Sequence, residues 1–165
     1  MTILYIQHRS HRVFSLFPTF LRRPNESIGI PLRLIFWWVH LVALITAAQA
    51  KHQMIVKHSL AEGYSEADYQ FLMRVTDLAL AGSFLCLCFC AIGVLTARTL
   101  RFGLLNLFLA LCDAVAGVLL IVCCWDAHTH VARIWHVFYI FSIIPTGIEM
   151  GTLLYTYIKG IDMFY

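Results

Sequence analysis

Three ionisable residues, His40, Asp113 and Glu149, lie inside long apolar stretches of the 165-residue chain. An ionisable group in a bilayer core is costly, so each of the three is a candidate functional residue. With a helical rise of about 1.5 Å per residue, each falls roughly 12 to 16 Å from the same end of its predicted span. The sequence therefore predicts an intramembrane polar cluster of one imidazole and two carboxylates, contributed by three different helices.

Such a cluster has two possible uses. It could relay protons or hold a cation, or it could hold the helices together through polar contacts worth about 1 kcal/mol each. A relay needs further acids that continue the path to both membrane faces, and the sequence has no second set of them. We therefore favour the structural use.

Asp77 is a different kind of acidic residue, because it lies about one turn inside the end of its apolar stretch. Arg74 precedes it by three residues. Residues at this spacing are neighbours on a helix surface, and a long basic side chain can reach the membrane interface. We expect an interfacial Arg74–Asp77 pair.

The six cysteines do not form a metal-binding pattern. Three of them alternate along one apolar stretch, which scatters them around a helix axis, and no CxxC motif is present. Two more are adjacent, and adjacent cysteines rarely pair with each other. We expect all six to act as small apolar side chains.

An acidic residue and three histidines gather around residues 126–136, a short polar link: Asp126, His128, His130 and His136. Histidine and carboxylate are suitable ligands for divalent metals. Nothing in the spacing fixes their geometry, however, and we expect a solvated loop. His40 and His136 lie at different predicted depths, so they do not form a pair of axial haem ligands.

Motifs of the common enzyme classes are missing from the sequence. There is no nucleophile elbow, P-loop, GxGxxG or zinc-protease motif. A net charge of +3, without a basic face, also argues against nucleic-acid binding. We expect a protein that is not an enzyme, with no catalytic residue, no metal or other cofactor and no evident small-molecule substrate.

The elements that position these residues follow from composition. The chain is 61% hydrophobic and 13% charged, with a mean hydropathy of +0.78. A soluble domain is about half apolar and about a quarter charged, so the excess of apolar residues indicates lipid as the solvent. The composition predicts an integral membrane protein.

Four apolar segments are long enough to cross a bilayer, which takes about 20 residues. Because the links between them are short, consecutive helices must run antiparallel. The predicted fold is an all-α four-helix transmembrane bundle with short loops. Its predicted parts are a basic arm, a four-span domain and a short tail: residues 1–31, 32–158 (with spans 32–50, 75–97, 102–125 and 135–158) and 159–165.

The basic residues predict the orientation of the bundle. Cytosolic segments carry an excess of Lys and Arg, and eight of the twelve lie in the arm, the second link and the tail: Arg9, Arg12, Arg22, Arg23, Arg33, Arg98, Arg101 and Lys159. We therefore expect both termini in the cytosol. Trp125 and Trp135, at the two ends of the third link, are expected as anchors at the outer interface.

The N-terminal arm has no acidic residue in its first 23 positions and mixes Arg and His with Phe and Leu. Three interpretations stay open: an amphipathic segment on anionic lipid, a mitochondrial presequence, or a basic tail that only enforces topology. Asn25-Glu26-Ser27 is a formal glycosylation sequon, which would stay unmodified in the predicted orientation.

Small and polar residues predict which helix faces pack. Asn106, Ala110, Asp113 and Gly117 recur at helical spacing and form one stripe. In the fourth span, Gly147 and Gly151 form a GxxxG surface for close helix packing, and Glu149 points nearly the opposite way. Pro145, one turn earlier, is expected to kink the span.

Two parts of the sequence carry a family resemblance. The first span reads Arg33-Leu-Ile-Phe-Trp-Trp-Val-His40, and the last third contains Trp125-Asp126, Trp135, Phe138-Tyr139 and Pro145-x-x-x-Glu149-Met150. Both resemble the transmembrane protein 107 family, tetraspans of the ciliary transition zone. The likeness covers about residues 32–158. It is loose in the second span and in the third before Trp125, so Asp77 and Asp113 inherit no role, and the arm here is longer than the family's usual start.

The resemblance implies a scaffold and diffusion-barrier component that supports ciliogenesis and controls ciliary membrane composition. Its implied partners are membrane lipids and other transition-zone membrane proteins of the Meckel-syndrome module. His40, Pro145 and Glu149 match the family pattern, which implies roles in bundle integrity or partner contact. Two alternatives remain: an accessory subunit of a mitochondrial inner-membrane complex, suggested by the arm, and a small proton-coupled transporter that uses the polar cluster.

Overall fold

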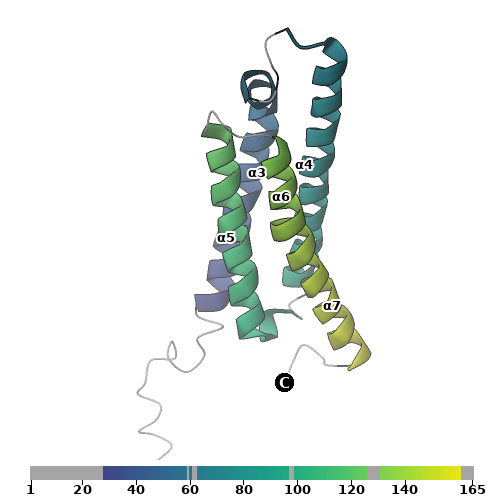
Figure 1. Ribbon diagram of the computed structural model, residues 1–165. Helices are drawn as coiled ribbons and strands as arrows, with labels where there is room; N and C mark the ends of the chain where they lie inside the picture. Colours follow the sequence, from purple (N-terminus) through teal and green to yellow (C-terminus); the bar gives the residue numbers. More distant parts are fainter. Residues whose placement is uncertain (1–27, 59, 61–62, 97–98, 126–130, 161–165) are drawn as a thin grey trace, which may run out of the picture.

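The computed structural model describes residues 28–58, 60, 63–96, 99–125 and 131–160. Within these ranges the chain is almost entirely helical, and four helical stretches are long and apolar enough to cross a membrane. They stand side by side, with short connections (Figure 1). The predicted all-α four-helix membrane bundle is thus confirmed.

The first two long helices extend beyond the predicted apolar ranges. Helix α3 covers Ile30–His58 and α4 covers Glu66–Leu95. The earlier start of α4 has a local cause: Ser65 caps the helix by accepting a hydrogen bond from the Asp68 backbone N–H at 3.2 Å. Such a cap satisfies one of the free amides of the first turn. Polar turns therefore extend both helices past their apolar segments.

The second half of the chain begins with a short 3-10 turn, η3 (Thr99–Arg101), which leads into α5 (Gly103–Trp125). The fourth span is continuous but changes its winding. It consists of α6 (Val131–Val137), the π-helical segment η4 (Phe138–Ile143) and α7 (Ile144–Ile158).

Pro145 explains the wider winding of η4. Proline has no N–H to donate, so the preceding turn cannot keep its regular hydrogen bonds. The Ile144 N–H instead bonds the carbonyl of Tyr139, five residues back. This is the π-helical pattern, one of the recognised ways in which a helix absorbs an interruption.

The most extensive helix contact joins α3 and α5, which are not consecutive in the chain. In an up-and-down bundle these two helices run in the same direction, as Figure 1 shows. Small side chains let them approach: Ala43, Ala47 and Ala116 are fully or almost fully buried. A Cβ at Gly117 would lie 3.1 Å from the Val39 side chain. Close packing of small residues is the usual basis of helix association in membranes.

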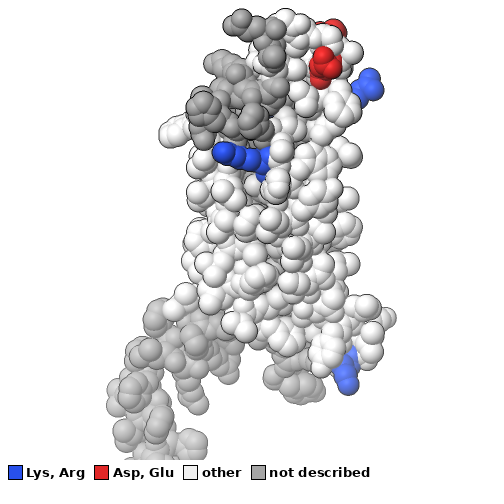
Figure 2. All heavy atoms as spheres, in the orientation of Figure 1, with Lys and Arg blue, Asp and Glu red and all other residues white. Residues whose placement is uncertain are grey.

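The outward faces of the bundle are apolar. Exposed side chains include Trp38, Leu78, Leu104 and Val118, as expected for surfaces that meet lipid. On the face that Figure 2 shows, the visible charged side chains lie in the upper part and at the lower end, with an uncharged surface between them. This distribution supports a multi-pass membrane protein.

Candidate functional site

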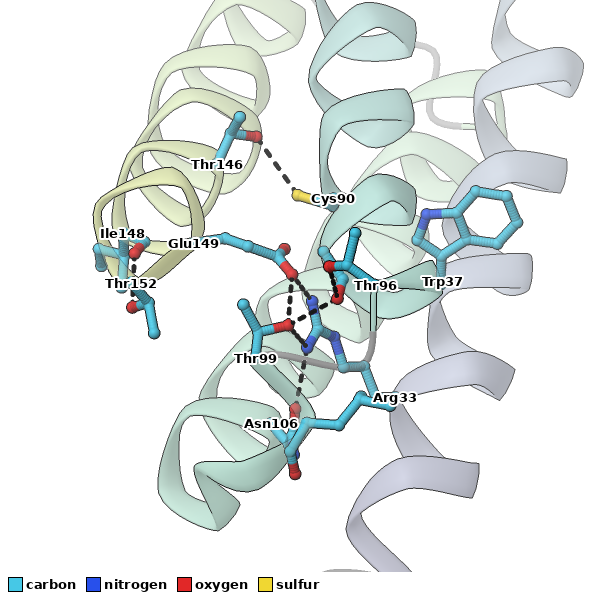
Figure 3. Close-up of polar contacts among 12 residues, drawn as sticks. Arg33, Trp37, Cys90, Thr96, Thr99, Asn106, Thr146, Ile148, Glu149 and Thr152 are labelled. Carbon is cyan, nitrogen blue, oxygen red and sulfur yellow. Dashed lines mark hydrogen bonds and ion pairs between the residues drawn. The ribbon is translucent and has the colours of Figure 1, made fainter. Parts of the chain in front are cut away.

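Arg33, in the first turns of α3, is the centre of a buried polar network and is only 2% exposed. One guanidinium nitrogen forms an ion pair with Oε1 of Glu149 on α7. The other nitrogen donates to Oδ1 of Asn106 at 2.8 Å and to the Thr99 hydroxyl at 3.3 Å. One side chain therefore connects α3 to α7, α5 and η3, as Figure 3 shows.

Thr99 and Asn106 complete this network by binding backbone carbonyls near the end of α4 and in η3. The Thr99 hydroxyl lies 3.1 Å both from the Gly93 carbonyl and from Oε1 of Glu149. The Asn106 amide donates to the carbonyl of Leu100 at 2.8 Å. The start of α3, the end of α4, the start of α5 and the middle of α7 are thus held together around one ion pair. Its guanidinium (Arg33) and carboxylate (Glu149) have opposite charges that cancel.

Gly93 makes room for the carboxylate of Glu149. A Cβ at position 93 would lie 2.6 Å from Cδ of Glu149 and closer still to Oε1. Real Cβ atoms do not approach a carboxyl group so closely, so only glycine permits this placement. The glycine near the end of α4 is therefore part of the site, although it contributes no polar group.

His40 and Asp113 form a second polar contact, separate from the first. The Nδ1 atom of His40 lies 2.8 Å from Oδ1 of Asp113, and both residues are buried, at 1% and 9% exposure. His40 follows Arg33 by seven residues, and Asp113 follows Asn106 by seven. Because α3 and α5 are parallel, this equal spacing produces two layers of contacts about 10 Å apart along the bundle.

The predicted cluster of His40, Asp113 and Glu149 therefore divides into two sets. Equal depth of the three residues would require all spans to end at one level, but α7 continues past the ends of α3 and α4 (Figure 1). Glu149 consequently lies level with the first turns of α3 and meets Arg33. The two sets stay close enough to line one small cavity.

Arg33 is the main site residue that the sequence does not single out, because its place next to the basic arm groups it with the cytosolic charges. Two signals in the sequence bear on it: Pro31, which suits the first turn of a helix, places Arg33 inside the first span, and the seven-residue spacing places Arg33 on the same helix face as His40. Without Arg33, the predicted cytosolic side still holds seven basic residues against four, so the predicted orientation does not change.

Other predicted residues lie as follows. Asp77 pairs with Lys51 of α3 and not with Arg74 in the described contacts, because the polar extension of α3 brings Lys51 beside α4.

Gly147 and Gly151 have open space where a Cβ would lie, so their surface faces out of the bundle. Pro145 is buried next to η4.

The two predicted tryptophan anchors differ in their surroundings. Trp125 is 89% exposed at the end of α5. Trp135 packs against the core and contacts the rings of Phe138 and Tyr139. Residues 1–27, 126–130 and 161–165, which include most of the arm, the glycosylation sequon and most of the histidine-rich link, lie outside the described residues.

The chain matches a family described as TMEM107 transmembrane protein over residues 29–153, well over half of its length. The chain belongs to the TMEM107 family. The matched range includes Arg33, His40, Gly93, Asp113 and Glu149, and so the whole of both polar sets. No curated protein and no solved structure matches the chain.

The arrangement in this TMEM107 family member is suited to positioning helices. Proton transfer to Glu149 would neutralise the partner of Arg33 and leave a buried, unpaired guanidinium, which is costly. Among the residues that the structure describes, no group of three His, Cys, Asp or Glu side chains could hold a metal ion. The geometry therefore favours the structural use of the polar residues over a relay.

Proposed function

We propose that this protein is a non-enzymatic scaffold and diffusion-barrier component of the ciliary transition-zone membrane. Membership of the TMEM107 family is the observation that carries the proposal. In this function it supports ciliogenesis and helps to control which lipids and proteins enter the ciliary membrane. Both termini lie in the cytosol, and the partners are other transition-zone membrane proteins of the Meckel-syndrome module.

The small extramembrane part of the described structure supports this proposal. The described connections between the helices are short, so the long apolar helix faces make up most of the surface of the described residues. A protein of this shape acts mainly by contacts with neighbouring helices and lipids. Such contacts need a bundle of defined shape, and the network around Arg33 ties all four spans together.

The experiment is localisation in a ciliated cell. A tagged copy should concentrate between the basal body and the ciliary shaft, together with a transition-zone marker, and removal of the protein should reduce ciliation or let membrane proteins leak into the cilium. Uniform distribution over the plasma membrane would contradict the proposal. Accumulation in mitochondria would favour the alternative of an inner-membrane accessory subunit.

A further inference from the structure

A small cavity lies between the two polar sets, inside the bundle. Its walls include Arg33, His40, Asp113, Ser142 and Glu149, together with Thr146, two cysteines and apolar side chains. The space open to the centre of a water molecule is about 10 Å³. This volume is about the minimum for one water molecule and far too small for any organic ligand.

Three residues of the cavity walls each carry a polar atom with no hydrogen-bond partner among the described residues: Nε2 of His40, Oγ of Ser142 and Oε2 of Glu149. Their residues are 1%, 4% and 0% exposed. Buried polar atoms in proteins are almost always paired, with protein or with ordered water. Three unpaired atoms around one cavity of this size point to a common partner.

We propose that this cavity binds a single water molecule, which joins the His40–Asp113 pair to the Arg33–Glu149 network. The inference is independent of the proposed ciliary function. A buried water molecule typically forms about three hydrogen bonds, and the cavity offers that number of unpaired atoms.

The donors and acceptors fit a water molecule in a definite arrangement. An ionised Asp113 can only accept, so Nδ1 of His40 donates to it and Nε2 of the neutral ring is an acceptor. The carboxylate oxygen of Glu149 is also an acceptor. Water fills both needs with its two hydrogens, and its oxygen accepts the hydrogen of Ser142.

A monovalent cation of similar size fits the site less well. Arg33 lines the same cavity and already neutralises Glu149. The guanidinium repels a second positive charge, although the Asp113 carboxylate attracts one. Hard cations prefer several oxygen ligands, and only two of the three unpaired atoms are oxygens. The proposal therefore commits to water, and a cation becomes an outcome of the test.

The water also accounts for the position of Ser142. This residue belongs to the π-helical segment η4, three residues before Pro145. Wide turns of this kind are often found at functional sites. Through the bound water, the widened turn gains contacts with α3 and α7, so the irregular part of the fourth span is fixed to its neighbours.

The test uses the full chain in phospholipid bilayers, with ¹⁵N-labelled histidine and solid-state NMR. Magnetisation is transferred from water protons to Nε2 of His40, whose resonance is assigned through the backbone of α3. The wild type should show transfer at short mixing times. Ser142→Val, whose methyl groups occupy the cavity, should lose it, and Ser142→Ala should weaken it because one hydrogen bond is removed.

Ser83→Ala is the matched control. Ser83 is 3% exposed, but its hydroxyl donates to the Ala79 carbonyl within its own helix at 3.0 Å, so the His40 signal should not change. If Ser142→Val does not fold, Ser142→Ala decides the question alone. Absence of transfer in the wild type, equal transfer in both Ser142 variants and the wild type, or a His40 shift when sodium is replaced by choline would overturn the proposal.

Discussion

Gly93 and Glu149 occupy complementary space: the carboxyl group of α7 lies where a side chain at position 93 of α4 would begin. The carboxylate reaches Arg33 from this position, and the Thr99 hydroxyl, with one hydrogen to donate, lies 3.1 Å from both the carboxylate and the carbonyl of Gly93. Packing and charge pairing are therefore coupled here. A methyl group at position 93 would disturb an ion pair that it does not itself form.

Gly93→Ala should lower the free energy of unfolding by about 3 kcal/mol, at the low end of the cost of breaking a buried ion pair. Thermal unfolding in detergent or nanodiscs measures the loss. Gly147→Ala is the control, because its Cβ meets nothing within 4 Å; the higher helix propensity of alanine should stabilise this variant by at most about 1 kcal/mol. Equal stability of the two variants would show that the close contact is unimportant.

Arg33→Gln and Glu149→Gln should each cost about 3 to 5 kcal/mol, since each leaves a buried charge without its partner. Combining them removes both charges, so the double variant should be destabilised by less than the sum. A double-mutant cycle on unfolding measures the coupling. Simple additivity would contradict the ion pair.

Arg33→Lys should also be destabilised, because a lysine cannot reproduce the planar set of donors to Glu149, Asn106 and Thr99.

Asp113→Ala should have a smaller effect, about 1 to 2 kcal/mol, in the range of polar contacts between membrane helices. The variant removes the partner of His40 Nδ1 but leaves the Arg33 network intact. Unfolding of Asp113→Ala in a His40→Ala background isolates the contact, because its effect should then fall. An effect as large as that of Glu149→Gln would mean that the two sets are of equal weight.

Asp77 should be coupled to Lys51 and not to Arg74. The pair is partly exposed, so removing it with Asp77→Asn should cost at most about 1 kcal/mol. Raising the salt concentration should reduce that cost further. Two double-mutant cycles, Asp77 with Lys51 and Asp77 with Arg74, distinguish the partners. Coupling to Arg74 alone would restore the pairing expected from local spacing.

Replacing Gly147 and Gly151 together by leucine should leave the bundle folded but weaken lateral contacts. Both glycines face out of the bundle, and small residues of this spacing let another helix approach closely. If the proposed transition-zone contacts use this face, the double variant should reach the membrane normally and lose its concentration at the ciliary base. Unchanged localisation would place the contacts on another face.

Much of the fold follows from the sequence by itself. The ratio of apolar to charged residues requires a membrane environment, and four apolar segments with short links leave little choice but an up-and-down bundle. The stripe from Asn106 to Gly117 was also readable, because residues at helical spacing must share a face, and all four of its residues are buried. These features depend on local periodicity and on the length of the chain.

The partners of the polar residues were decided only by the tertiary structure. Whether Glu149 contacts His40 or Arg33 depends on the position of α7 along the bundle axis relative to α3. No local sequence pattern determines that position. The same holds for the parallel contact of α3 with α5, which is set by side-chain packing between helices that are not consecutive. Residue types and helix lengths are properties of single segments, whereas a buried ion pair needs the relative height and rotation of several.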